Sequence, residues 1–187
     1  WVLISRTGNV LYSVSEGATW LRSELPTLGN GEFYTSIAYA NGTFVAVGTS
    51  SKSAYSTNNA SSWTEVDQTI DNDEWVHLAA GGNTFVAIAG SSHAIKYSND
   101  NGASWTEGSI DTSGDSTINN WRQVVFGNGR FVAISSDLRT SAFSFNGITW
   151  YNSNLQVQGT MLAYGNGIFL LVDNETGICC QSEDGLD

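Results

Sequence analysis

The feature that most constrains this chain is a nine-residue segment that recurs along its whole length. The clearest copy runs from Tyr97 to Trp105, and ungapped matches occupy 12–20 and 55–63. A copy shortened by one residue occupies 143–150, and a fifth begins at 181 and reaches the last residue, one position before its expected Trp. The serines of the five copies lie at 13, 56, 98, 144 and 182, a period of about 40 residues. Such a period predicts a repeat architecture.

Each repeat contains four short segments that read as strands. The first, such as Tyr34–Ala40, is followed by Asn41-Gly42, a dipeptide that favours a tight hairpin because both residues tolerate positive φ. The second, such as Phe44–Gly48, is apolar at nearly every position, as in a strand buried on both faces. The third ends in an aromatic-Ser pair, and the fourth starts at the Trp of the recurring segment.

Four antiparallel strands per period of about 40 residues predict an all-β fold, a β-propeller of four-stranded blades. We expect residues 1–187 to form a single propeller with blades at 33–66, 74–107 and 120–153. Partial blades are expected at 1–25, without strand one, and at 159–187, without strand four. Two interpretations remain open, a five-bladed ring with two incomplete blades or part of a larger chain with more blades.

The recurring segment has the residues of a tight polar turn, and we call its copies the Ser boxes. The side chain two residues after the Ser is expected to accept from the amide two residues further on. Glycine follows where positive φ is needed, but Ala60 replaces it in one copy, which predicts a strained or altered turn. The Trp should pack between sheets, with its N–H donating to an acceptor. The structural box residues are Ser13, Ser15, Gly17, Trp20, Ser56, Asn58, Trp63, Ser98, Asp100, Gly102, Trp105, Ser144, Asn146, Gly147, Trp150, Ser182, Asp184 and Gly185.

Composition excludes several classes of function. The formal net charge of −11, with 18 acidic and seven basic residues, argues against nucleic-acid partners and an anionic membrane surface. No apolar run is long enough to predict membrane insertion. Neither His77 nor His93 has another ligand at metal-binding spacing, and no Gly-rich phosphate loop occurs, so no metal or cofactor is expected. Cys179 and Cys180 are adjacent and provide no disulfide framework.

The pattern aromatic-Ser-x-Asp-x-Gly-x-x-Trp resembles the Asp-box, or BNR repeat, of sialidase-like propellers, and the resemblance covers the whole chain. It implies that each box is a hairpin between strands three and four, remote from any catalytic face. Sialidases also need three converging arginines, a Tyr–Glu pair and an acidic proton donor. None of Arg6, Arg22, Arg122, Arg130 and Arg139 stands in the Phe/Tyr-Arg-Ile-Pro motif of that family. We therefore expect no catalytic residue in this chain.

One constellation is a candidate for ligand binding. Tyr34, Trp75 and Trp121 stand ten residues before the strand-two Phe of their repeats, so they recur at one end of the first strands. With Arg122 they would form an aromatic and polar surface suited to stacking on sugars. The alternative interpretation is that the three rings cap the core between blades.

The resemblance extends to function. Low-charge repeats of this kind look like those of bacteriophage tail-fibre and other virion proteins, and of secreted adhesins. We therefore expect a non-enzymatic structural or binding module on a virion or cell surface, with a host glycan or neighbouring subunits as partners. One alternative is a sialidase-like glycoside hydrolase with catalytic residues outside this sequence. The other is a BNR-type assembly factor resembling the photosystem II stability factors, although these carry a basic patch that this chain lacks.

Overall fold

The computed structural model describes residues 1–67, 74–111, 120–136, 140–154 and 159–186. These residues form β-strands and no helix, which confirms the all-β prediction. The strands build five sheets in chain order. The first contains β1 (Val2–Ile4), β2 (Asn9–Tyr12) and β3 (Leu21–Glu24). The second contains β4 (Tyr34–Ala40), β5 (Thr43–Gly48), β6 (Lys52–Ser56) and β7 (Thr64–Asp67).

The remaining sheets repeat this order. The third contains β8 (Trp75–Gly81), β9 (Thr84–Ala89), β10 (Ile95–Ser98) and β11 (Thr106–Glu107). The fourth contains β13 (Trp121–Gly127), β14 (Arg130–Ser135), β15 (Thr140–Ser144) and β16 (Thr149–Asn154), and the fifth contains β17 (Met161–Gly165), β18 (Ile168–Val172) and β19 (Cys179–Ser182). Successive strands of each sheet pair antiparallel. Within the described residues, the first sheet has no counterpart of β4 and the fifth has none of β7.

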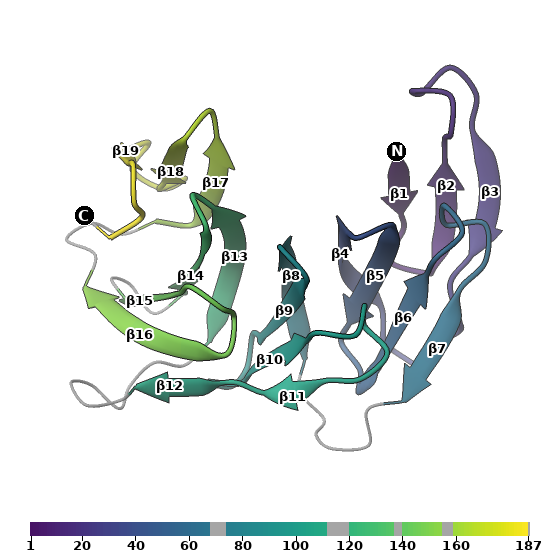
Figure 1. Ribbon diagram of the computed structural model, residues 1–187, viewed down its shortest axis with the longest axis horizontal. Helices are drawn as coiled ribbons and strands as arrows, with labels where there is room; N and C mark the ends of the chain where they lie inside the picture. Colours follow the sequence, from purple (N-terminus) through teal and green to yellow (C-terminus); the bar gives the residue numbers. More distant parts are fainter. Residues whose placement is uncertain (68–73, 112–119, 137–139, 155–158, 187) are drawn as a thin grey trace.

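The five sheets stand side by side in an open arc, with the first and last sheets at its two ends (Figure 1). We call β4, β8, β13 and β17 the inner strands, because they lie on the inner side of the arc and contact one another in sequence. Strands β3, β7, β11 and β16 lie on its outer side (Figure 1). The arrangement places equivalent residues of successive repeats at equivalent points along the arc.

The core lies between neighbouring sheets, because the second strands of the three middle sheets, β5, β9 and β14, are buried on both faces. Val45 and Val47 on β5 pack against the third sheet, where they meet Phe85 and Ala87 of β9. The intervening Ala46 points the other way and packs against the first sheet. This alternation is the period-two pattern of a strand, and it recurs at each of the junctions between the sheets.

One strand was missed by the sequence analysis. Residues Ser109–Asp111 form β12, which pairs parallel with the outer edge of β16 and gives the fourth sheet a fifth strand. The sequence analysis predicted four strands per blade and placed this segment between the blades 74–107 and 120–153. Ile110 explains why this segment joins the sheet, because its side chain packs against the core between the third and fourth sheets.

The Ser boxes form the turns that follow β2, β6, β10, β15 and β19, the strands that are third in each repeat. In the third sheet the Ser98 hydroxyl donates to Asp100 at 2.7 Å and accepts from the Gly102 amide at 2.8 Å. The Asp100 carboxylate in turn accepts from the Ser104 amide at 2.9 Å. Burial alone would raise the pKa of Asp100, but the hydrogen bonds from Ser104 and Ser98 outweigh it, so the pKa lies below its usual value.

The turn geometry corrects one detail of the prediction. In the first three boxes the side chain two residues after the Ser accepts a hydrogen bond from the backbone amide four residues further on, as Asn58 does from Ser62. The expected acceptance from the amide two residues on occurs in the two shorter boxes, at Asn146 and Asp184. The difference follows from length, because the longer boxes contain one more residue before the next strand.

Ala60 adopts the backbone conformation that glycine has in the other boxes. Its φ is 65°, and the preceding Asn59 also has positive φ, at 61°. The amide of Ala60 still donates to the Ser56 hydroxyl at 3.0 Å. The turn therefore keeps its hydrogen bonds and is strained at Ala60, as the substitution predicts.

The box tryptophans connect each sheet to the one before it. Trp63 Nε1 donates to the Ser23 hydroxyl on β3 at 3.4 Å, and Trp105 Nε1 donates to Ser53 on β6 at 3.2 Å. Trp150 is fully buried and donates instead to the Gly147 carbonyl of its own box. Trp20, in the first sheet, is 41% exposed. Packing between sheets thus holds for three boxes and fails for Trp20, which lies at the open end of the arc.

Candidate binding surface on the inner strands

The three aromatic residues proposed to stack on a ligand are buried. Tyr34, Trp75 and Trp121 are 4%, 3% and 1% exposed. Each ring packs back against the preceding sheet, as Trp75 does against Val45 and Val47. This burial corrects the expectation of a sugar-stacking surface, because a buried ring has no face left for a ligand. The alternative interpretation, that the rings cap the core between blades, describes the structure.

Polar partners explain why these rings settle in the core. Tyr34 donates its hydroxyl proton to the Pro26 carbonyl at 2.8 Å, and burial raises the pKa of Tyr34, with a smaller contribution from Glu65. Trp121 Nε1 donates to the His93 carbonyl at 3.1 Å. Buried Tyr and Trp normally find such acceptors, and here the acceptors lie in connectors that the sequence alone does not bring close.

Directly after each buried ring the inner strand contains a bulge. The pairing register shifts between Tyr34 and Ser36, between Trp75 and His77, and between Trp121 and Gln123. A bulge inserts one residue and redirects its side chain. The inserted residues are Thr35, Val76 and Arg122, and Thr160 precedes the fourth inner strand. We call these four residues the bulge row.

Hydrogen bonds tie the bulge row and the residues beside it to the next inner strand. Thr35 Oγ1 donates to the Trp75 carbonyl at 2.7 Å, and Arg122 Nε donates to the Thr160 carbonyl at 2.6 Å. One residue further along each strand, Ser36 Oγ accepts from the Leu78 amide at 3.1 Å, and Gln123 Oε1 accepts from the Leu162 amide at 2.7 Å. Side chains thus link backbones from sheet to sheet, which holds the surface in a fixed shape.

His77 occupies the same position as Ser36 and Gln123 on its own strand. Burial lowers its pKa, and the backbone of Val124 opposes the shift only in part. The imidazole is therefore neutral at pH 7. The neutral imidazole lies beside the backbone of Val124 on β13 and so contributes to the contacts between neighbouring inner strands.

Arg122 is the member of the proposed set that the structure leaves exposed. Near the other end of the arc, Arg6 is also exposed, its guanidinium lies 3.6 Å from the centre of the Phe33 ring, and its carbonyl accepts from the Tyr34 amide. Two of the seven basic residues of a strongly acidic chain thus stand where inner strands begin. The sequence analysis named Arg122 but did not predict that Arg6 lies beside an inner strand. The contact of Arg6 with Phe33 depends on the turn between β1 and β2.

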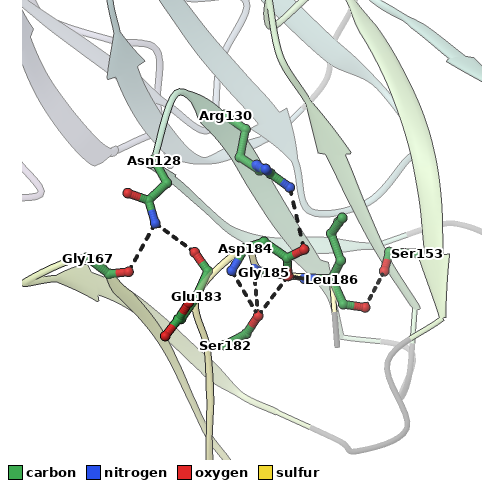
Figure 2. A network of polar contacts seen from close by, with 9 residues as sticks. All are labelled: Asn128, Arg130, Ser153, Gly167, Ser182, Glu183, Asp184, Gly185 and Leu186. Carbon is green, nitrogen blue, oxygen red and sulfur yellow. Dashed lines mark hydrogen bonds and ion pairs between the residues drawn. The ribbon is translucent and has the colours of Figure 1, made fainter.

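The polar contacts at the far end of the arc hold the last sheet in place. Asn128 Nδ2 donates to the carbonyls of Gly167 at 3.0 Å and Glu183 at 2.7 Å (Figure 2). Its Oδ1 accepts from the Tyr164 hydroxyl at 2.8 Å. Ser153 Oγ donates to the Leu186 carbonyl at 3.2 Å (Figure 2). Two side chains of the fourth sheet therefore fix the fifth Ser box in place. They are Asn128, in the turn between β13 and β14, and Ser153, on β16.

No group of three or more His, Cys, Asp or Glu side chains among the described residues is placed to hold a metal ion. Over the same residues, no helix has the length and apolar character needed to cross a membrane. Arg139 and the segments 68–73 and 112–119 lie outside the described residues.

Comparison with known proteins confirms the propeller fold. A family model described as the DUF6242 beta propeller domain matches residues 1–118, more than half of the chain. No curated protein shows significant sequence similarity to the chain. Structures with a similar fold include YCF48 bound to D1 peptide, with a TM-score of 0.73 and 17% identity over 100% of this chain. The chain spans 62% of the length of that YCF48 chain.

Two further structures share the fold at low identity. The computationally designed Ika8 protein has a TM-score of 0.65 and 16% identity, covering 98% of this chain and 55% of its own. The GH74 enzyme of Niastella koreensis has a TM-score of 0.63 and 19% identity, covering 100% of this chain and 29% of its own. These likenesses show a common β-propeller architecture.

Proposed function

The chain belongs to the DUF6242 β-propeller domain family, and from that premise we propose that it is a non-enzymatic structural and binding module. Its proposed partner is an extended protein segment that lies along the bulge row. The observation that carries the proposal is Arg122, an exposed guanidinium whose Nε is fixed by a 2.6 Å hydrogen bond to the carbonyl of Thr160, just before β17. An arginine held in this way loses little conformational freedom when it binds carbonyl or carboxylate oxygens.

The shape of the bulge row supports an extended partner. Its members follow one another from strand to strand along the inner side of the arc, and Thr35 and Arg122 are each bonded to the neighbouring strand. A surface fixed before binding costs less ordering on association. The fold also supports a protein partner by analogy, because the similar propeller YCF48 has been seen bound to a peptide.

We place this module on a virion or cell surface, in the role of presenting a rigid surface to neighbouring subunits. A host glycan is the less favoured partner, because the three rings that would stack on it are buried. The charge of −11 supports a partner that is not itself strongly acidic overall. Local acidic or carbonyl groups of such a partner would meet Arg122 and Arg6.

The experiment is selection of binders from a random peptide library displayed on phage, followed by titration of the selected peptides. The variant R122A should weaken binding at least about tenfold, because a hydrogen bond to a charged group contributes about 1.5–3 kcal/mol. The matched control is R22A, which removes an exposed arginine from the outer strand β3 and should leave affinity unchanged. Equal affinities for R122A and wild type would exclude the bulge row as the binding surface.

A second candidate function is hydrolysis of glycosides, favoured by the likeness in fold to the GH74 enzyme. Such an enzyme would need two catalytic carboxylates, at the separation that a retaining or an inverting reaction requires. Incubation with chromogenic glycosides, including sialosides, distinguishes the two. Steady release of chromophore by the purified chain would support the enzyme and overturn the non-enzymatic proposal.

A further inference from the structure

Asn-Gly steps recur at the turns of this chain, and the structure places them in different environments. Five of them precede the last sheet, at Asn30, Asn41, Asn101, Asn128 and Asn146. In such a step the backbone nitrogen of the glycine can attack the side-chain amide of the asparagine, because glycine has no side chain to block the approach. The attack needs an asparagine side chain that is free to rotate and a glycine amide that is not held in a hydrogen bond.

Hydrogen bonds oppose this attack in the Ser boxes. The Gly102 amide donates to the Ser98 hydroxyl at 2.8 Å, and the Gly147 amide donates to the Ser144 hydroxyl at 2.8 Å. The Asn146 side chain also accepts from two backbone amides of its own box. The steps at 101 and 146 are therefore protected by the same bonds that form the turns.

Asn41 and Asn128 are a matched pair. Each occupies the first position of the two-residue turn after an inner strand, with φ of 50° and 47°, and the glycines that follow have φ of 75° and 74°. Both asparagines are exposed. Backbone conformation and exposure therefore do not distinguish the two steps.

Their hydrogen bonds do distinguish them. Asn128 is held on the sheet that follows it by three side-chain hydrogen bonds. The third sheet follows Asn41 in the same way, but within the described residues the Asn41 side chain has no hydrogen-bond partner. One reason is that Ala80 occupies the place of Tyr164, whose hydroxyl holds Asn128. The Gly42 amide likewise has no acceptor in the part of the chain that the structure describes.

We propose that Asn41 is a site of spontaneous deamidation through a succinimide, and that Asn128 is protected from the same reaction by its hydrogen bonds. The Gly42 nitrogen forms a bond to Cγ of Asn41, the bond from Cγ to Nδ2 breaks, and ammonia leaves with the proton of the glycine nitrogen. Water then opens the ring, adding its hydroxyl to one of the two ring carbonyl carbons and its remaining proton to the ring nitrogen. Opening at one carbonyl gives aspartate, and opening at the other gives isoaspartate, with no change in oxidation state.

The isoaspartate product alters the hairpin of β4 and β5. It adds a methylene to the main chain in a turn of two residues, whose closing pair is Ala40 and Thr43. Thr43 is buried, so the added atom displaces a packed residue. Each conversion also adds one negative charge to a chain whose formal net charge is already −11. We expect the Thr43 and Phe44 amides to exchange with solvent faster after the conversion.

The test follows the uptake of heavy oxygen from labelled water by the folded chain at mildly alkaline pH, with each site read by peptide mass spectrometry. Label should enter at Asn41 at least about tenfold faster than at Asn128, because conversion at Asn128 must first break hydrogen bonds. The chain unfolded in urea is the reference, in which each step converts at the rate that its local sequence sets. Chromatographic separation of the two products identifies isoaspartate.

The variant Y164F gives the sharpest control. It removes the hydroxyl that donates to Asn128 Oδ1 and keeps the ring, so conversion should become faster at Asn128 and stay unchanged at Asn41. Equal protection of the two steps in the folded wild type, each measured against the unfolded chain, would overturn the proposal. So would an unchanged rate at Asn128 in Y164F, since that result means that hydrogen bonding is not what separates the two steps.

Discussion

At the residue scale, the Ser boxes show how one position decides whether a turn is strained. Gly102 and Ala60 have the same role, with φ of 84° and 65°, but the Cβ of an alanine at 102 would collide with Val45. We expect G102A to destabilise the protein by about 2 kcal/mol or more, from left-handed strain together with overpacking. The free energy of unfolding from urea titration measures the effect.

The reverse change supplies the control. In A60G the relief of left-handed strain, about 1–2 kcal/mol, is offset by the greater freedom of glycine in the unfolded chain. The free energy of unfolding should therefore shift by no more than about 1 kcal/mol. A loss in A60G as large as that in G102A would show that the turn does not depend on glycine-like geometry.

His77 gives a prediction about pH. Its pKa in the folded protein lies below the usual 6.5, with burial as the main cause. The unfolded chain then binds more protons at this residue, so the stability it contributes is complete above about pH 6.5 and is lost as the pH falls below that value. The variant H77Q should flatten this decline between pH 7 and pH 5, as measured by thermal unfolding.

The exposed His93 provides the matched control, because H93Q removes a histidine that is not packed between inner strands. A decline in stability that is identical in wild type and H77Q would contradict the assignment to His77. A decline removed by H93Q alone would transfer it to the other histidine.

At the scale of elements, the last sheet depends on Asn128, which contacts it through three hydrogen bonds. We expect N128A to destabilise the protein by about 1 kcal/mol, because these hydrogen bonds are exposed and water can replace part of what they contribute. Hydrogen exchange should increase first in β17 to β19. Exposed Asn99, which accepts from Thr84 within its own sheet, is the control, and N99A should leave exchange in the last sheet unchanged.

How far the sequence predicts an element depends on where its contacts lie. The hairpins and boxes were predictable because their hydrogen bonds join residues within four positions of one another, as at Ser98 and Gly102. Strand β12 was not, because its pairing with β16 depends on residues about 40 positions away. The burial of Trp121 was left open for the same reason, since its acceptor His93 lies 28 positions earlier.

At the scale of the whole molecule, the repeat predicts the sheets and their order, and the structure adds the packing between them. Val45 and Ala46 are adjacent apolar residues of one strand, but Val45 packs against the third sheet and Ala46 against the first. Position in the strand, rather than composition, therefore decides which neighbouring sheet an apolar residue contacts.

The central claim is that the chain is an open arc of five sheets whose cores lie between neighbours. Small-angle X-ray scattering from the purified chain at low concentration tests it most directly, because the scattering profile depends on the distances between the sheets. The account predicts a scattering profile that fits the arc of Figure 1, with the first and last sheets far apart. A profile that fits a closed ring or a compact sphere would contradict it.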